Sequence, residues 1–235
     1  TLTINGNGFV NAETDNAGSS CAVWANGGDV IINGGDIVAK SVDGRGIHGS
    51  DNITINGGDV TAIGGHKAIH YDLSGSLTVA EGMKIQASTT VDGELGEYVA
   101  ENHDTYKKIV ITPPDIYVGG VGMCDGDYLA VGATKTQTTK PSGGYAYYKD
   151  GKLTLNNYSY EGKGYQYDST GYYNYAVIYS KNDLTLELIG NNTLTQTHST
   201  GEMIYVDGAN LTVGGDGGLH LAVGAVEVLL KGLFH

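Results

Sequence analysis

Rings that could contact a ligand recur at one position of a repeated segment. Trp24, His48 and His70 each follow an apolar residue in segments that echo one another, and Tyr179 and Tyr205 hold the same place further along the chain. Strict alternation along a strand would set these rings in one outward column. Flat rings on a rigid face can lie against the apolar C–H faces of sugar rings. The alternative is a ladder of rings that only supports the fold.

Tyrosine supplies a second candidate contact surface. Ten of the 17 tyrosines lie between residues 145 and 175. Tyr165, Tyr167, Tyr172 and Tyr173 fall in a polar, glycine-rich segment, 162–175, which we predict to be a loop that cannot bury all its rings. Tyrosine offers a large amphipathic surface at low entropic cost, which suits contact with sugars or proteins. The alternative is a corner loop folded back on its own rings.

Aspartates at repeat corners are candidate metal ligands. Asp36 and Asp59 occupy equivalent positions of two copies, which predicts that they stack about 4.8 Å apart. Two carboxylates this close either attract a cation or stay solvated. Calcium requires six to eight oxygen ligands, and the chain contains no Asp-x-Asp-x-Asp string. A Ca²⁺ ion is therefore the one cofactor that we expect as a candidate, at this pair.

Catalysis would depend on the polar residues of neighbouring repeats. Arg45, His48, His66, Lys67 and His70 are predicted to gather on one face. A lyase acting on pectin-like polymers needs a base beside a calcium cluster, and a hydrolase needs paired acids at a defined separation. The pattern predicts no carboxylate trio on that face. We therefore assign no catalytic residue and expect a non-enzyme.

A repeat of about 23 residues must position all these side chains. The segment 29–39 returns as 52–62, and further copies begin at Leu2 and Leu77. Each copy holds two or three runs of alternating apolar and polar residues separated by Asn-Gly-Gly turns, which is a strand pattern. The period predicts an all-β solenoid, a right-handed parallel β-helix, with Asn5, Asn33 and Asn56 in an amide ladder.

The chain is predicted to contain two such modules in tandem. Residues 1–112 form the first, in which four coils are closed by a segment after residue 88. Pro113 and Pro114 mark a break, because neither can join a strand ladder. Residues 113–235 form the second module. It has a non-repetitive entry (115–150) that includes a hairpin, and coils beginning near Leu153, Leu184 and Leu211.

Charge and composition limit the partners. The net charge is −13, and Arg45 is the only arginine, which argues against nucleic acid and anionic membrane surfaces. No apolar run is long enough for membrane insertion. Cys21 and Cys124 are the only cysteines; they are either two free thiols, the interpretation that we favour, or a long-range disulfide.

The alternation of Leu-Thr-Ile-Asn-Gly-Gly with Asp-Val-Thr-Ala resembles the repeats of clostridial carbohydrate-binding β-helix surface proteins. The segments that begin at Ile116, Gly151 and Asp183 are similar to a module start in large secreted proteins of anaerobic gut bacteria. The resemblance implies an extracellular or cell-surface location and tandem modules. For some members it also implies binding of cellulose or pectin-like polymers, with calcium in some.

These observations predict a secreted or surface-attached module that binds a polysaccharide or glycan, or serves as an adhesin stalk. Two alternatives stay open. One is a lyase or hydrolase acting on a pectin-like polymer. The other is a filament subunit that assembles head to tail, in which the apolar segment 226–234 covers the open first coil of a neighbour.

Overall fold

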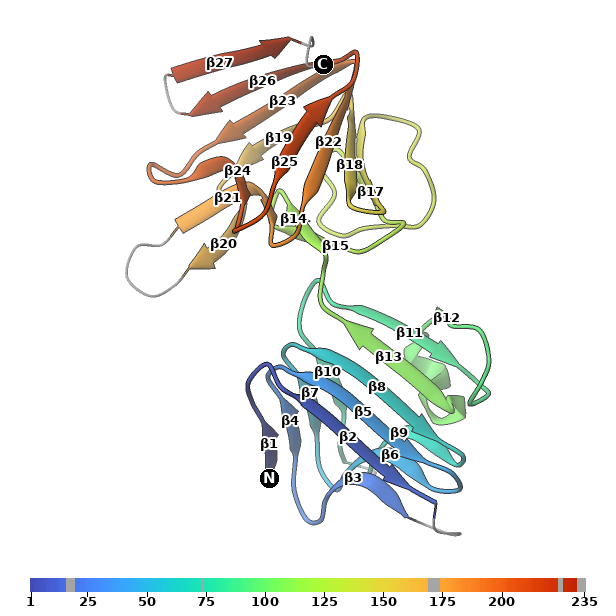
Figure 1. The fold of residues 1–235 in the computed structure, drawn as a ribbon. Helices are drawn as coiled ribbons and strands as arrows, with labels where there is room; N and C mark the ends of the chain where they lie inside the picture. The colour runs from blue at the N-terminus through green and yellow to red at the C-terminus, as the bar shows by residue number, and fades with distance from the viewer. Residues whose placement is uncertain (16–19, 73, 169–173, 224–225, 232–235) are drawn as a thin grey trace. The chain divides into compact units, whose positions relative to one another are not determined.

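The computed structural model describes residues 1–15, 20–72, 74–168, 174–223 and 226–231. The chain divides into two compact units, Thr1–Pro113 and Pro114–His235. Short β-strands dominate both units (Figure 1). Within the described ranges, no helix is long and apolar enough to cross a lipid bilayer.

The first unit is a parallel β-helix whose successive coils each add a strand to the same sheets. The first sheet contains β1 (Leu2–Ile4), β4 (Val30–Ile32), β7 (Ile53–Ile55) and β10 (Leu77–Val79). The second begins with β2 (Phe9–Thr14), β5 (Asp36–Ser41) and β8 (Asp59–Gly64). The third contains β3 (Cys21–Ala25), β6 (Arg45–Gly49) and β9 (Lys67–Tyr71). All these neighbours pair in parallel, which confirms the fold that the repeat predicts.

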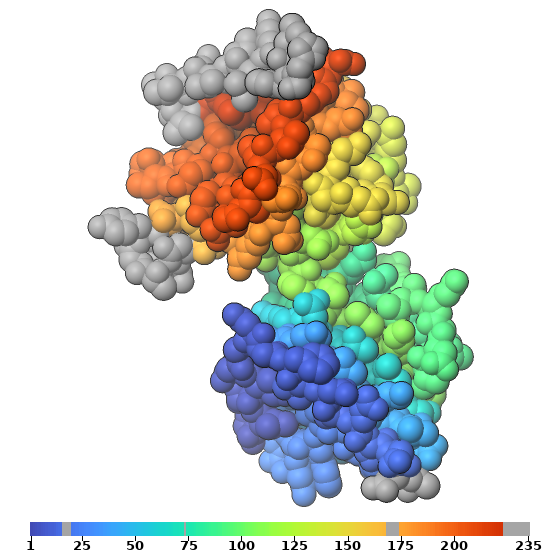
Figure 2. All heavy atoms as spheres, viewed as in Figure 1, coloured from blue at the N-terminus to red at the C-terminus, as the bar shows by residue number. Residues whose placement is uncertain are grey.

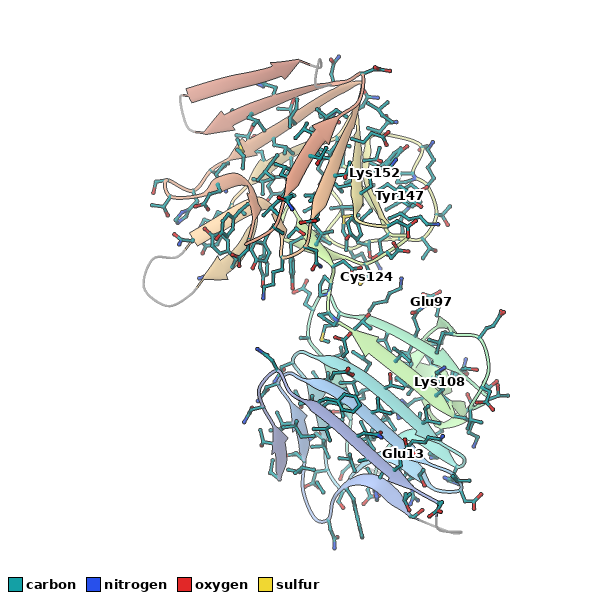
Figure 3. The ribbon with its side chains drawn as sticks, viewed as in Figure 1. Glu13, Glu97, Lys108, Cys124, Tyr147 and Lys152 are labelled. Carbon is teal, nitrogen blue, oxygen red and sulfur yellow. The ribbon has the colours of Figure 1, made fainter. Side chains whose placement is uncertain are left out.

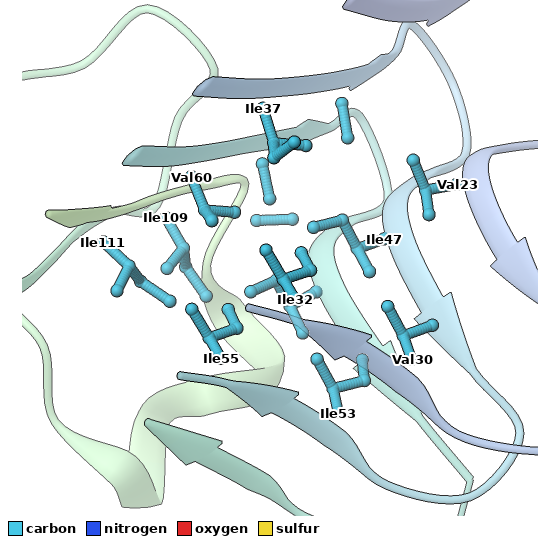
Figure 4. Packing of buried hydrophobic residues seen from close by; sticks show 14 of the residues in the cluster. Val23, Val30, Ile32, Ile37, Ile47, Ile53, Ile55, Val60, Ile109 and Ile111 are labelled. Carbon is cyan, nitrogen blue, oxygen red and sulfur yellow. The ribbon is translucent and has the colours of Figure 1, made fainter. Parts of the chain in front are cut away.

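Equivalent residues of successive coils stack on one another. Ile32 pairs with Ile55, and both are fully buried in the aliphatic core (Figure 4). At the corner, Asn33 Nδ2 donates to Asn5 Oδ1 (2.7 Å), and Asn56 Nδ2 donates to Asn33 Oδ1 (2.8 Å). The predicted amide ladder is therefore present. Gly58, which ends the Asn-Gly-Gly turn, has φ = 87°, a value that glycine adopts without steric cost.

The segment that closes the first unit differs from the prediction of four complete coils. β11 (Lys84–Ser88) does not stack on β8, because β13 (Lys108–Thr112) lies antiparallel between them. Ile109 and Ile111 of β13 are fully buried and supply the apolar face that a further parallel strand would otherwise provide. The outer edge of β11 pairs with the short β12 (Gly96–Glu97).

A short helix packs against the edge of the third sheet of the first unit. The 3₁₀ helix η1 (Ala100–Thr105) packs against β9. Its His103 is buried and stacks on Tyr71, with ring centroids 4.7 Å apart. The Ala68 amide of β9 donates to the Tyr106 carbonyl (2.9 Å). The segment after residue 88 therefore closes this unit by pairing and by packing.

The second unit repeats the coil plan with longer connections. One sheet contains β16 (Tyr128–Ala130), β17 (Tyr145–Lys149), β18 (Lys152–Asn156), β22 (Leu184–Ile189) and β25 (Leu211–Gly214). Another contains β19 (Ser159–Gly162), β23 (Asn191–Gln196), β26 (Gly218–Val223) and β27 (Val226–Lys231). The third contains β14 (Ile116–Val118), β15 (Val121–Met123), β20 (Tyr165–Asp168), β21 (Asn174–Ser180) and β24 (Glu202–Val206). β25, at the edge of its sheet, lies at the surface of this unit (Figure 2).

Antiparallel strands flank the parallel coils of the second unit. The predicted hairpin is present as β17 and β18, and its turn places Asp150 at φ = 50° and Gly151 at φ = 74°, as a tight hairpin turn requires. β14 pairs antiparallel with β21. β27 pairs antiparallel with β26 of the same chain. Residues 226–231 are therefore a strand of their own unit, and head-to-tail assembly stays a prediction.

Candidate functional site

Three neighbouring strands of the second unit bring tyrosines into one row. Tyr117 of β14 pairs with Tyr179 of β21, which pairs with Tyr205 of β24. Ring centroids are 6.3 Å apart for Tyr117 and Tyr179, and 5.9 Å apart for Tyr179 and Tyr205. The register of Tyr179 and Tyr205 is the one that the sequence predicts. Tyr117 was not predicted, because it lies in the entry segment, outside the coil repeat.

Two tyrosines of β20 pack against this row. The Tyr165 ring stacks on that of Tyr117, with centroids 3.6 Å apart. The Tyr167 ring contacts both Tyr179 (5.3 Å) and Tyr205 (4.7 Å). We name the five residues Tyr117, Tyr165, Tyr167, Tyr179 and Tyr205 the tyrosine cluster.

The predicted loop 162–175 is partly a strand. β20 pairs antiparallel with β21. Gly164, with φ = 77°, sits so close to β21 that an added Cβ would lie 2.0 Å from the Ala176 carbonyl oxygen. The alternation of Tyr165 and Tyr167 around Gln166 is itself a strand pattern, which the glycines and polar residues around it obscured. Tyr172 and Tyr173 lie outside the described residues.

The tyrosine cluster has a buried centre and a polar rim. Tyr179 is 5% exposed, and the other four members are half-buried. At the rim, Tyr167 Oη donates to Glu202 Oε2 (2.9 Å) and Tyr205 Oη donates to Asp207 Oδ1 (3.3 Å). Burial, followed by the charge of Asp207, raises the pKa of Tyr179 to about 12, so this phenol is neutral at physiological pH.

The column of Trp24, His48 and His70 in the first unit has the predicted register, but its rings are less exposed to solvent than predicted. Trp24 pairs with His48, and His48 pairs with His70. The rings of Trp24 and His48 are parallel within 3° at 5.8 Å, and those of His48 and His70 are 4.8 Å apart. Trp24 is 52% exposed, whereas His48 is only 8% exposed. Strict alternation placed all three rings outside, but His48 is buried because it lies between the other two rings.

Asp72 joins both histidines of the column. His48 Nε2 lies 3.4 Å from Asp72 Oδ1, and His70 Nε2 lies 3.5 Å from the same oxygen. The other ring nitrogen of His48, Nδ1, lies 3.6 Å from Cys21 Sγ. Burial, followed by the charges of Arg45 and Lys67, lowers the pKa of His70 to about 4. Asp72 was not predicted as part of this group, although it follows His70 by two residues in the string His-x-Asp.

The aspartate pair has the predicted register. Asp36 pairs with Asp59, and both side chains are exposed. Burial of its carboxyl, followed by the charge of Asp36, raises the pKa of Asp59. Among the described residues, this pair is not part of a group of three His, Cys, Asp or Glu side chains that could share an ion. Calcium at this pair stays a prediction.

Of the remaining polar residues predicted on this face, Lys67 forms an ion pair with Asp104. Arg45 of β6 and Lys67 of β9 occupy neighbouring positions in the parallel strand ladder. Lys67 Nζ donates to Asp104 Oδ1, and this hydrogen bond lowers the pKa of the Asp104 carboxyl. His66 is exposed. Cys21 and Cys124 are thiols and are not joined to each other by a disulfide.

Residues 53–75 match the model of a protein family described as a beta helix repeat. The matched segment contains β7, β8 and β9, one complete coil of the first unit. No curated protein and no solved structure matches the chain. Together with the parallel ladders of both units, the match supports a β-helix repeat fold.

Proposed function

We propose that this chain is a non-catalytic module of a secreted or cell-surface protein and that it binds carbohydrate through the tyrosine cluster. The observation that carries the proposal is the gathering of five tyrosine rings from four strands on one sheet of the second unit. Four of these rings are half-buried and keep part of their surface in contact with solvent.

The chemistry of the cluster suits a sugar. Aromatic faces and edges offer apolar surface to sugar C–H groups, and phenol oxygens and carboxylates offer partners for sugar hydroxyls. Glu202 and Asp207 already accept hydrogen bonds from the rim tyrosines. A net charge of −13 disfavours anionic polymers and favours a neutral polysaccharide.

The scaffold supports binding at low entropic cost. β21, which carries Tyr179, is held by ladders on both sides, and contacts between rings restrict the rotation of Tyr179 and its neighbours. A preorganised surface loses little conformational freedom when a ligand binds.

A panel of insoluble neutral and acidic polysaccharides, together with a glycan array, tests this proposal. We expect retention on at least one neutral polymer and reduced retention for Tyr205→Ala. The matched control is Tyr147→Ala: Tyr147 is also half-buried and stacks on Tyr128 at 4.2 Å, but it lies on a different sheet of the same unit.

Two outcomes would contradict the proposal. Absence of binding to every glycan would favour the stalk. Release of unsaturated ends from polygalacturonate would show a lyase. Trp24, whose ring is exposed to solvent, remains a predicted second contact for carbohydrate, in the first unit.

A further inference from the structure

We propose that His48, His70 and Asp72 form a binding site for a divalent transition metal of the Zn²⁺ type. The ligand atoms would be Nε2 of both histidines and Oδ1 of Asp72. This site lies in the first unit and does not depend on the tyrosine cluster of the second.

The spacing of the three atoms fits a metal better than it fits direct hydrogen bonds. The two Nε2 to Oδ1 distances are 3.4 and 3.5 Å, beyond the usual N–H···O range of about 2.7–3.2 Å. Ligands bound tetrahedrally at about 2.0–2.1 Å lie about 3.3–3.4 Å from one another. The three ligand atoms all lie within 4.8 Å of each other. Both nitrogen–oxygen separations are therefore close to the length of an edge of such a tetrahedron.

The fold holds the histidines in an orientation that suits a ligand. The parallel ladder of β6 and β9 sets His48 beside His70, and the Trp24 ring stacks against the outer face of His48. Cys21 Sγ lies near Nδ1 of His48, which leaves Nε2 directed at Asp72. Metal-bound histidines are commonly oriented by a hydrogen bond from the second ring nitrogen, and Cys21 Sγ is placed to accept one from Nδ1 of His48.

The ligand set and its charge define the class of ion. Two imidazoles and one carboxylate suit Zn²⁺ and neighbouring first-row metals, whereas Ca²⁺ and Mg²⁺ prefer oxygen ligands alone. The Asp72 side chain is 54% exposed, so an ion can reach the site from solvent. Arg45 and Lys67 oppose a cation there, but Lys67 is paired with Asp104 and Asp72 supplies a negative charge.

The only tryptophan of the chain provides a direct readout. Because Trp24 lies 5.8 Å from the His48 ring, a paramagnetic Co²⁺ ion held by His48 should quench its fluorescence. The experiment titrates the full chain with Co²⁺ after treatment with EDTA, follows tryptophan emission and visible d–d absorption, and then adds Zn²⁺ or Ca²⁺ as a competitor. We expect saturable quenching by one equivalent of Co²⁺ that Zn²⁺ reverses and Ca²⁺ does not.

Matched variants separate this site from other histidines. Asp72→Asn should weaken Co²⁺ and Zn²⁺ binding at least tenfold, and its exposed position predicts an unchanged melting temperature in EDTA. His66→Gln removes an exposed histidine outside the group and should bind like the parent chain. Quenching that is absent, that survives equally in Asp72→Asn, or that is lost equally in His66→Gln would overturn the proposal.

Discussion

The ring of Tyr167 lies parallel to that of Tyr179, with planes within 4° and centroids 5.3 Å apart. Tyr167 lies on β20, which pairs antiparallel with β21. Tyr179 lies on β21, which pairs in parallel with β24. The tyrosine cluster therefore depends on two kinds of pairing: the coil repeat sets Tyr179 beside Tyr205, and the β20–β21 hairpin adds Tyr165 and Tyr167.

The amide ladder should contribute measurably to the stability of the first unit. Asn33→Ala removes one hydrogen bond to Asn5 and one from Asn56. Because the ladder is exposed, we expect a loss of about 1 kcal/mol in the free energy of unfolding, measured by urea denaturation. Asn11→Ala, which removes only an exposed contact to Glu13 on one strand, is the control. Equal effects of the two substitutions would contradict a specific role for the ladder.

The aliphatic column should be the main source of stability in the same unit. Ile55 is fully buried between the neighbouring coils, so Ile55→Ala should lower the free energy of unfolding by about 2–5 kcal/mol. Thr54→Ala, on the opposite face of the same strand, should cost less than about 1 kcal/mol. A small effect at Ile55 would show that this core is not close-packed.

The surface pair of Lys152 and Glu187 should make the stability of the second unit depend on pH. Lys152 lies on the same side of this unit as Tyr147 (Figure 3), and its Nζ is 3.1 Å from Glu187 Oε2. Hydrogen bonds from Lys152 and then Thr154 lower the pKa of Glu187 below 4.5. Because the folded-state pKa is depressed, the stabilisation is present above the unfolded pKa and is lost as the pH falls through the folded pKa.

The matching measurement is thermal unfolding as a function of pH. Glu187→Gln should lower stability near pH 7 by at most about 1 kcal/mol, since the pair is partly exposed. The difference from the parent chain should shrink as the pH falls through the depressed folded-state pKa of Glu187, and it should vanish once the carboxyl is protonated in both the folded and the unfolded chain. Glu161→Gln, an exposed position on β19, is the control. A difference that persists after the carboxyl is fully protonated would point to packing rather than charge.

The contacts that the coil repeat determines could be predicted from the sequence. Residues at equivalent positions of successive copies stack, so Asn33 lies on Asn56 and Tyr179 beside Tyr205. Antiparallel additions leave no such periodic trace. This is why the insertion of β13 between β8 and β11 was not predicted, and why the strand nature of β20 was missed. Asp72 was missed because it lies beyond the last strand of its coil.

The second unit should bind its carbohydrate with little dependence on salt. The proposed contacts are apolar surfaces and hydrogen bonds rather than ion pairs. Salt, which screens interactions between charges, should therefore weaken them little. We expect the dissociation constant for a neutral polymer to change less than about twofold between 0.05 and 0.5 M NaCl. A steep fall in affinity with salt would contradict recognition through the tyrosine cluster.

The most direct test of carbohydrate binding by the tyrosine cluster is a comparison of binding isotherms for substitutions at Tyr205. With the best polymer from the panel, Tyr205→Ala should weaken binding about tenfold, or about 1.4 kcal/mol. Tyr205→Phe keeps the ring but loses the hydrogen bond to Asp207, and it should retain most of the affinity. Tyr147→Ala should match the parent chain. Unchanged binding in Tyr205→Ala, or an equal loss in Tyr147→Ala, would contradict this account.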